Sequence, residues 1–398
     1  MKRLSDLSLF TRVFQVAAIF ISFKVFNSAE LNYYSNEWAR ILGIYYLLPL
    51  LYFGFNTTYF NYVRINNIDI KKGLDFGISI MLFIILPSSI LVIILLNIIY
   101  PDLHPTIILV MGFYLFFNFI NTLTYTLNKE RNSIIIQLLT WVTLSIFFTV
   151  IYLFKSTYFT FIRIGVIFFA IQIGFSIYSL KYLPKPKYLR IDLVKSQFAK
   201  SIEFFIASIS SNFLNSGQVL IVEQLGITTN LSNYLIIQKI FSLISNLHLS
   251  YIAPLNIQLS NLLQERNFKA IRNTINRINY TYSLPALVIV FVISFYLINP
   301  LFQLITGSQQ NSVESKLSIL FAAYYLIISL SNIYSVVINT DGQFRFQIFV
   351  SLISTFCIII SLLIFKNLLS DLLFPISALI AAIITFAIYY LNFSMKYT

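Results

Sequence analysis

A lysine stands about two turns inside the apolar stretch 232–261, where it could bind an anion. An ammonium group at that depth costs about 2.5–3.5 kcal/mol to insert into a bilayer, so we expect it to face water or an anionic partner. At 100° per residue, Ser242, Asn246 and Ser250 fall on the same helix face as Lys239. Such a polar stripe is typical of a helix that lines a hydrated cavity. The alternative is that Lys239 extends to the membrane interface or pairs with a neighbouring helix.

The other charges inside or beside apolar stretches are mostly basic. Together with Lys239, the candidates for anion contacts are Arg12, Lys24 and Arg163. Lysine acts as a point charge and arginine can grip a phosphate through two hydrogen bonds, so the pattern suits a phosphate or pyrophosphate cargo. Glu223, at the outer end of a predicted span, is the candidate for ion coupling, or alternatively a partner for one of these cations.

Asparagine and serine side chains form stripes on several predicted helices. The amides that we select as candidates for hydrogen bonds to a polar substrate are Asn118, Asn121, Asn212, Asn215 and Asn246. Such residues also serve helix packing, at about 0.6 kcal/mol per hydrogen bond. Stripes in both halves of the chain, combined with buried cations, favour a hydrated cavity.

The composition places these residues in a membrane. The chain has 398 residues, of which 58% are hydrophobic and 10% charged, against about 25% charged in soluble proteins. A single cysteine, two histidines and the absence of a Walker motif or nucleophile elbow predict no metal, no cofactor and no enzymatic activity.

The hydropathy pattern predicts an all-α polytopic membrane protein with about twelve transmembrane helices. We expect an N-terminal six-helix lobe at residues 1–180, a basic cytoplasmic connector at 181–200 and a C-terminal six-helix lobe at 201–398. The expected spans are residues 7–26, 41–62, 76–100, 106–127, 133–154, 158–180, 202–222, 232–261, 274–298, 316–337, 346–365 and 372–391.

The distribution of basic residues predicts the orientation. Nineteen of the 27 Lys and Arg residues fall in segments on the same side as the N-terminus, and seven fall on the other side. The positive-inside rule then places both termini in the cytoplasm, and it accounts for the net charge of +13 without a nucleic-acid partner.

The two halves resemble each other. Pro87 interrupts the third predicted span and Pro285 the ninth, 198 residues later, while Asn121 and Asn332 precede similar polar turns. Repeats of six spans must share one orientation, so we expect a pseudo-two-fold axis along the membrane normal. Parallel repeats with a binding site at their interface are typical of transporters.

Two stretches resemble the polysaccharide flippases, the O-antigen and capsule transporters of the multidrug/oligosaccharidyl-lipid/polysaccharide exporter superfamily. EWARILGIYYLLPLLYFGFNTTYFNYV is similar to their second helix, with Phe53–Gly54 in the position of its aromatic–Gly motif. QLGITTNLSNYLIIQKIF followed by APLNIQLSNLLQERNFKAIR is similar to their seventh-to-eighth helix junction, where Lys239 matches a common basic residue. The family's acidic residue before the aromatic–Gly motif is replaced by Tyr52.

The resemblance implies a flippase that moves an undecaprenyl-pyrophosphate-linked oligosaccharide across the bacterial cytoplasmic (inner) membrane by alternating access, with a polysaccharide polymerase as a further partner. Two other functions stay open. A drug or cation antiporter of the same fold would favour buried carboxylates over buried cations. A membrane-embedded oligosaccharide polymerase or glycosyltransferase would need a long outer loop with Asp, Arg or His clusters, and the outer loops here are short.

Overall fold

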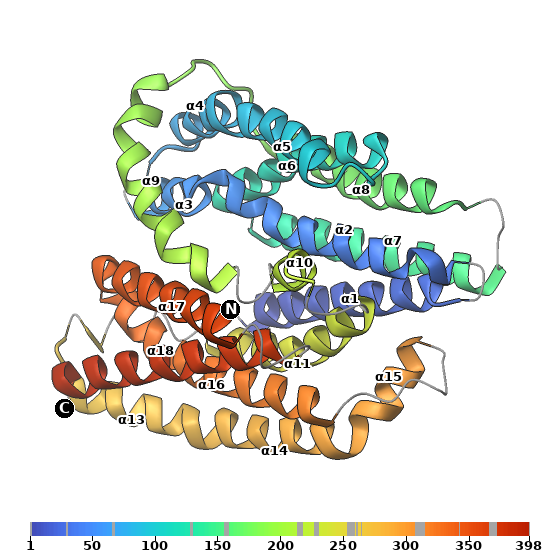
Figure 1. Ribbon diagram of the computed structural model, residues 1–398. Coiled ribbons are helices and arrows are strands. Elements are labelled where there is room, and N and C mark those ends of the chain that lie inside the picture. The colour runs from blue at the N-terminus through green and yellow to red at the C-terminus, as the bar shows by residue number, and fades with distance from the viewer. Residues whose placement is uncertain are drawn as a thin grey trace. The chain divides into compact units, whose positions relative to one another are not determined.

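The computed structural model describes residues 2–28, 31–65, 68–127, 130–154, 159–212, 218–226, 231–252, 259, 262–263, 265–306, 315–341, 343–365 and 372–397. Every regular element in these residues is helical, which confirms the predicted all-α fold class (Figure 1). The chain divides into two compact units, Lys2–Phe205 and Ile206–Thr398. The proposed division into two lobes and a connector at residues 181–200 stays a prediction.

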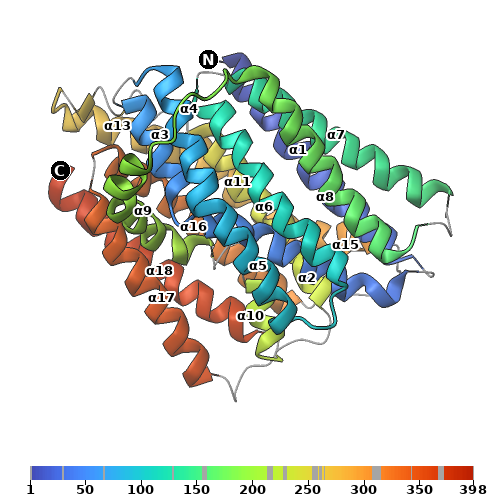
Figure 2. The same cartoon turned by 90° about the horizontal axis from the view of Figure 1, so that it is seen from above.

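The N-terminal unit is built around α6 (Pro105–Thr126), which packs against α5, α7 and α8. The helix α1 lies along α7, as the view in Figure 2 shows. Its elements are α1 (Lys2–Phe26), η1 (Asn32–Tyr34), α2 (Ser35–Leu47), η2 (Leu48–Tyr52), α3 (Phe55–Ile65), α4 (Ile70–Ile80), η3 (Met81–Ile85), α5 (Leu86–Ile99), α6, α7 (Glu130–Phe154), α8 (Phe161–Tyr178), η4 (Ser179–Tyr182) and most of α9 (Ile191–Asn212).

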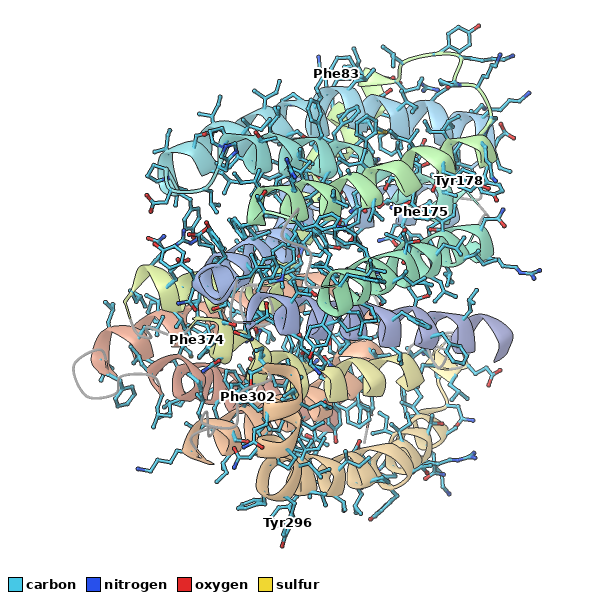
Figure 3. All side chains as sticks on the ribbon, turned by 90° about the vertical axis from the view of Figure 1, so that its right-hand side faces the viewer. Phe83, Phe175, Tyr178, Tyr296, Phe302 and Phe374 are labelled. Carbon is cyan, nitrogen blue, oxygen red and sulfur yellow. The ribbon has the colours of Figure 1, made fainter. Side chains whose placement is uncertain are left out.

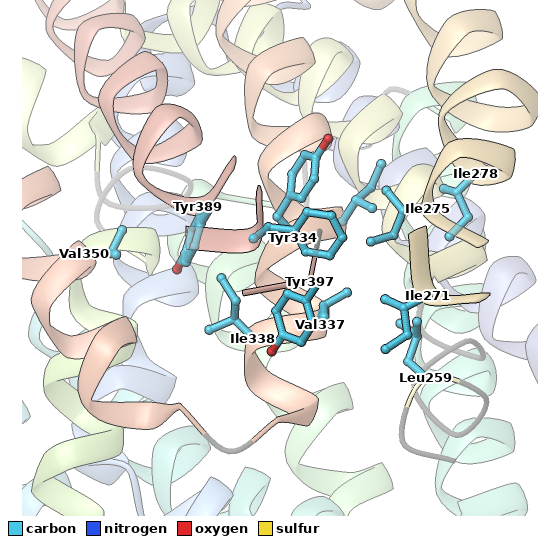
Figure 4. Packing of buried hydrophobic residues seen from close by; sticks show 12 residues of the cluster. Leu259, Ile271, Ile275, Ile278, Tyr334, Val337, Ile338, Val350, Tyr389 and Tyr397 are labelled. Atoms are coloured by element: carbon cyan, nitrogen blue, oxygen red, sulfur yellow. The ribbon is translucent and has the colours of Figure 1, made fainter. Parts of the chain in front are cut away.

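The C-terminal unit is built in a similar way around α16 (Ser315–Thr340), which packs against α11, α14, α17 and α18. Its further elements are α10 (Gln218–Gln224), α11 (Leu231–Ile252), α13 (Phe268–Ile278), η6 (Asn279–Ser283), α14 (Leu284–Val292), η7 (Ile293–Leu297), α15 (Ile298–Thr306), α17 (Phe344–Phe365) and α18 (Leu373–Tyr397). Isoleucines of α13 pack against Val337 and Ile338 of α16 and against Tyr389 and Tyr397 of α18 (Figure 4). This cluster fixes the C-terminal end of α18.

Long apolar helices make this a multi-pass membrane protein. Among the described residues, eight helices are long and apolar enough to cross a bilayer, and a bent pair makes a ninth. The predicted spans 7–26, 202–222 and 232–261 overlap α1, α9 with α10, and α11, which are not among the eight; residues 213–217, 253–258 and 260–261 of these spans lie outside the described part of the chain. Large apolar side chains are exposed on the outer helices: Phe83 and Tyr296 point away from the helices of their own units (Figure 3). Such exposure suits contact with lipid chains.

A π-helical turn recurs at the equivalent place in both halves. In the first half η3 ends directly before Leu86–Pro87, and in the second η6 ends directly before Leu284–Pro285. Proline lacks an amide hydrogen, and its ring would clash with the carbonyl group four residues earlier in a regular helix. A π turn changes the hydrogen-bond register where this conflict arises. The shared distortion, together with the shared packing around α6 and α16, supports the predicted repeat of six spans.

The second span differs from the continuous helix expected over residues 41–62. It is bent by 50° between Ser35–Tyr52 and Phe55–Val63. The bend is centred on Phe53 and Gly54, which have φ values of +48° and +76°. This left-handed conformation ends a right-handed helix, and glycine adopts it without steric cost.

Candidate functional site

A polar cavity of about 300 Å³ lies inside the N-terminal unit, and side chains of five helices line it. Helix α1 contributes Arg12 and three uncharged polar residues, and α2 contributes a tyrosine. Helices α6, α7 and α8 contribute mainly amides, hydroxyls and aromatic rings. The lining residues are Ser8, Thr11, Arg12, Gln15, Tyr45, Tyr114, Asn118, Asn121, Ile134, Gln137, Thr140, Trp141, Gln172 and Ser176.

A second cavity of about 330 Å³ adjoins the first. The two cavities share Asn118 and Asn121 of α6 and Gln137 of α7. The second extends toward α3, with Asn56, Thr57, Phe60, Thr122, Tyr125 and Thr126 as its remaining lining residues. The two predicted asparagines therefore stand between two adjoining polar spaces, each as large as the smaller ligand pockets of proteins.

Hydrogen bonds hold Asn118 and Asn121 in place. Asn118 Nδ2 donates to the hydroxyl oxygen of Tyr52 at 3.2 Å, and that hydroxyl donates to the carbonyl oxygen of Leu115 at 3.1 Å. Asn121 Nδ2 donates both to Asn118 Oδ1 at 3.2 Å and to Ser176 Oγ at 3.0 Å. Tyr52, which stands where the resembling family has an acidic residue, thus orients the amides by a neutral hydrogen bond.

A second set of hydrogen bonds holds side chains of α2, α8 and η4 beside the cavity. The Tyr45 hydroxyl donates to Gln172 Oε1 at 2.8 Å, and Gln172 Nε2 donates to the carbonyl oxygen of Phe168 at 3.3 Å. Ser179 Oγ donates to Asn121 Oδ1 at 3.2 Å, which joins η4 to the asparagine pair. Amide groups oriented in this way can bind hydroxyl groups of a ligand without first losing conformational freedom.

Arg12 brings a positive charge to the first cavity. Its side chain is exposed, and among the side chains that the structure describes no carboxylate lines either cavity. Within the described part of the chain, Arg12 forms no ion pair. A guanidinium group in this setting is available to a phosphate oxygen, to which it can donate two parallel hydrogen bonds.

The structure brings three predicted site residues together and separates two others from them. Arg12, Asn118 and Asn121 line one cavity. Lys24 lies twelve residues further along α1, about 18 Å away at 1.5 Å per residue, with Nζ 4.8 Å from the centroid of the Tyr152 ring. Arg163 is exposed in the first turn of α8.

The remaining predicted residues belong to the C-terminal unit or to the end of α9. Lys239 on α11 is buried, with 8% of its surface exposed. Glu223 is half-buried on α10. Asn215 and the side chains of Asn212 and Asn246 fall outside the described residues, so their roles stay predictions.

Close to Lys239 in sequence, α11 takes part in a buried polar network. The Tyr234 hydroxyl donates to Gln218 Oε1 at 3.1 Å. Gln218 Nε2 in turn donates to the hydroxyl oxygen of Tyr325 at 3.5 Å. A tyrosine–glutamine pair thus occurs inside each unit, Tyr45 with Gln172 in the first and Tyr234 with Gln218 in the second. These networks tie α8 to α2 and α10 to α11.

Sequence reasoning missed several lining residues, chiefly Gln15, Gln137 and Gln172. Their spacing carried a usable signal, since Gln15 follows Arg12 by three residues and Ser176 follows Gln172 by four. Such spacings place two polar side chains on one helix face. Tyr45 and Trp141 carried no signal of this kind, because aromatic residues are common throughout the chain.

The chain thus has two helical units with related packing, and the N-terminal unit contains a polar cavity. No family model and no curated protein matches the chain. Solved structures do match it over nearly its whole length. "Lipid II flippase MurJ, inward closed conformation" has a TM-score of 0.72 at 14% identity and covers 98% of this chain and 87% of its own.

Two multidrug transporters are similar to the chain as well. The MATE multidrug transporter DinF-BH has a TM-score of 0.67 at 12% identity, over 98% of this chain and 95% of its own. An inward-facing MATE family transporter of the MOP superfamily has a TM-score of 0.63 at 14% identity, and the match covers 100% of this chain and 95% of the transporter. At these identities the likeness shows the fold alone, which the chain shares with these transporters.

Proposed function

We propose that the protein is a flippase that moves an undecaprenyl-pyrophosphate-linked oligosaccharide from the cytoplasmic to the outer leaflet of a bacterial inner membrane. The observation that carries the proposal is the N-terminal cavity, where Arg12 stands among amide and hydroxyl side chains and no carboxylate is found among the described lining residues. The fold is compatible with this activity, since a lipid II flippase shares it.

The chemistry of the cavity suits a sugar attached to a phosphate. Arg12 would bind an anionic oxygen, and Asn118, Asn121 and Gln137 would exchange hydrogen bonds with sugar hydroxyls. Trp141 and Tyr114 offer flat apolar faces beside these polar groups. Such a mixed lining is typical of pockets that orient a ligand by a few polar contacts.

The other site residues keep their proposed roles. Lys239 would contact the pyrophosphate in the C-terminal unit, Glu223 would couple transport to an ion, and Lys24 and Arg163 would offer further anion contacts. The amides of Asn212, Asn215 and Asn246 would bind sugar. Both termini would lie in the cytoplasm, and a polysaccharide polymerase would consume the product on the outer side.

A drug or cation antiporter is the second candidate function, because multidrug transporters share the fold equally. A cationic drug requires a negative or electron-rich site, whereas the charge that lines the described cavities is that of Arg12. The sign of this charge is the observation that favours the flippase.

The test is the sidedness of lipid-linked oligosaccharide in cells that lack the protein. We expect intact repeat units to accumulate on the cytoplasmic leaflet, and plasmid-borne protein to restore their export. Single units that reach the outer leaflet without being polymerised would assign the protein to a later step. Unchanged lipid-linked pools together with lost drug resistance would assign it to the antiporters.

A further inference from the structure

A short extended segment is fastened along α4 in the N-terminal unit. This segment, residues 183–190, is called the basic strap below. It joins α8 to α9 and passes beside α4 in both Figure 1 and Figure 2. The backbone amide of Lys187 donates to Asp75 Oδ1 at 2.7 Å, and that of Arg190 donates to Ser79 Oγ at 2.7 Å.

These two bonds set the position of the basic strap on α4. Asp75 and Ser79 are both buried, and they lie one helical turn apart on the same face. Because the hydrogen bonds use backbone amides, they leave the side chains of the strap free to face outward. The sequence of the strap therefore determines what this surface presents.

The surface presents four cations without ion pairs. Lys185 and Lys187 on the basic strap, and Lys71 and Lys72 in the first turn of α4, are exposed and pair with no carboxylate among the described residues. Arg190 differs, since it forms an ion pair with Asp192 at 2.9 Å. The four lysines thus give this surface an excess of positive charge, with Asp69 at the N-cap of α4 as an exposed carboxylate close to Lys71.

Apolar side chains stand next to these cations. Tyr188 and Leu189 on the basic strap are 72% and 51% exposed. On the same helical rod as Lys72, Ile70 is exposed beside the lysines, and exposed apolar residues recur from Leu82 and Phe83, about 15 Å beyond Lys72 at 1.5 Å per residue. The cations therefore lie at one end of the rod that carries these exposed apolar residues, on the side that the sequence predicts to be cytoplasmic.

We propose that the basic strap and the first turn of α4 bind anionic phospholipid headgroups of the cytoplasmic leaflet, with Tyr188 and Leu189 entering the boundary between headgroups and acyl chains. Clusters of four to eight cations beside a membrane-spanning helix are typical of anionic-lipid binding. The exposed apolar pair favours a lipid over a soluble acidic partner, since it gains contacts only at the membrane boundary. This surface is separate from the cavity, so the proposal stands whatever the substrate is.

The test uses the full-length protein in detergent, titrated with phosphatidylglycerol or phosphatidylcholine and analysed by native mass spectrometry. We expect the wild type to bind phosphatidylglycerol preferentially. Near a charged surface each cation contributes about fivefold to affinity. The variant Lys185→Gln/Lys187→Gln should therefore bind phosphatidylglycerol roughly 25-fold more weakly, and its phosphatidylcholine binding should not change.

A matched control removes the same charge from the other unit. Lys269→Gln/Arg272→Gln alters two exposed cations of α13, on the same predicted side of the membrane. This control should keep nearly the wild-type preference. If the control lost phosphatidylglycerol affinity to the same extent, the binding would depend on the overall charge of the protein. The assignment of the lipid site to the basic strap would then be wrong.

A second variant tests the apolar part of the surface. Tyr188→Ser/Leu189→Ser keeps every cation, so it should weaken phosphatidylglycerol binding at high salt, where electrostatic attraction is screened. If this variant binds like the wild type, and soluble polyphosphate displaces the lipid completely, the surface serves an acidic soluble partner and the lipid proposal fails.

Discussion

Gly54 lies directly against the backbone of α9, so close that a Cβ atom added to it would stand 2.0 Å from the carbonyl oxygen of Ser201. The same Cβ would stand 2.8 Å from the amide nitrogen of Phe205. Neither backbone atom can move away without displacing its helix. The bend of the second span and the position of α9 on the N-terminal unit therefore depend on one missing side chain.

Replacing this glycine should destabilise the protein. We expect Gly54→Ala to cost at least about 1–3 kcal/mol, because it combines a steric clash with a left-handed backbone conformation. The measurement is the thermal unfolding midpoint in detergent. Gly174→Ala is the matched control, since nothing lies within 4 Å of a Cβ at Gly174 on α8. The control should be neutral or slightly stabilising, given the helix preference of alanine. Equal midpoints for the two variants would contradict the packing argument.

Removing the positive charge from the cavity should impair transport. Arg12→Gln deletes hydrogen bonds to a charged group, worth about 1.5–3 kcal/mol, so we expect a loss of tenfold or more in the export rate at normal protein level. Arg12→Lys should retain part of the activity. Lys316→Gln, an exposed charge change at the start of α16, serves as the control. Export by Arg12→Gln at the control's rate would remove Arg12 from the site.

The second charge prediction concerns the C-terminal unit. Lys239→Glu should abolish export while leaving membrane insertion intact, because a carboxylate repels a pyrophosphate. Lys239→Gln should be less severe, since it removes attraction without adding repulsion. Surface polysaccharide and membrane protein level are measured together. Normal polysaccharide made by Lys239→Glu at normal level would show that this lysine has a packing role.

The asparagine network should matter for stability as well as for binding. Asn121→Ala removes the bonds to Asn118, Ser176 and Ser179, at about 0.6 kcal/mol each in a membrane protein, so we expect a loss of roughly 1–2 kcal/mol. Asn97→Ala is a suitable control, because its amide bonds only the carbonyl oxygen of Ile93 on an exposed face. If the two variants unfold in detergent at the same midpoint, the hydrogen bonds of Asn121 do not contribute to stability as a network.

Acid should release a contact at the C-terminal end of α18. Partial burial alone would raise the pKa of Asp341, but hydrogen bonds from Lys396, Tyr397 and Gln343 outweigh it and hold the pKa below its usual value. Asp341 Oδ2 accepts these bonds at 2.5, 2.6 and 2.7 Å.

Because the pKa in the folded protein is lower than in the unfolded chain, this stabilisation is complete above about pH 4 and is lost as the pH falls further. The Asp341–Lys396 pair is partly exposed, so its contribution is about 1 kcal/mol. We expect the unfolding midpoint of the wild type to fall more steeply between pH 6 and pH 3 than that of Asp341→Asn. Parallel curves would mean that other carboxylates dominate the acid response.

Much of the fold follows from hydropathy alone. The expected span 106–127 is α6, and the expected span 133–154 lies within α7, because an apolar helix in lipid must bond its own backbone groups. The bend at Gly54 was not predictable, since it depends on contact with residues almost 150 positions later. Local sequence contains Pro49 and Gly54, but it does not specify the angle.

The candidate site was predictable only in part. Residue type identified Arg12, Asn118 and Asn121 as unusual inside apolar helices, and they do meet. From sequence alone, Lys24 and Arg12 look like equivalent candidates for one site. Because both lie on α1, the helical rise over twelve residues places them too far apart to line the same cavity. Gln137 and Gln172 become recognisable once the contacts between α6, α7 and α8 are known, because a lone glutamine in a helix does not reveal which neighbour it faces.

The π turns that precede Pro87 and Pro285 bear on how the chain evolved. A distortion inherited at the same place in both halves points to duplication of an ancestral six-span chain. Such an ancestor would have worked as a pair of identical subunits, in which every cavity residue occurred twice. The halves now carry different cations, Arg12 on α1 and Lys239 on α11. Fusion of two such copies allows asymmetry, because each half can then acquire its own charged residues without a matching change in the other.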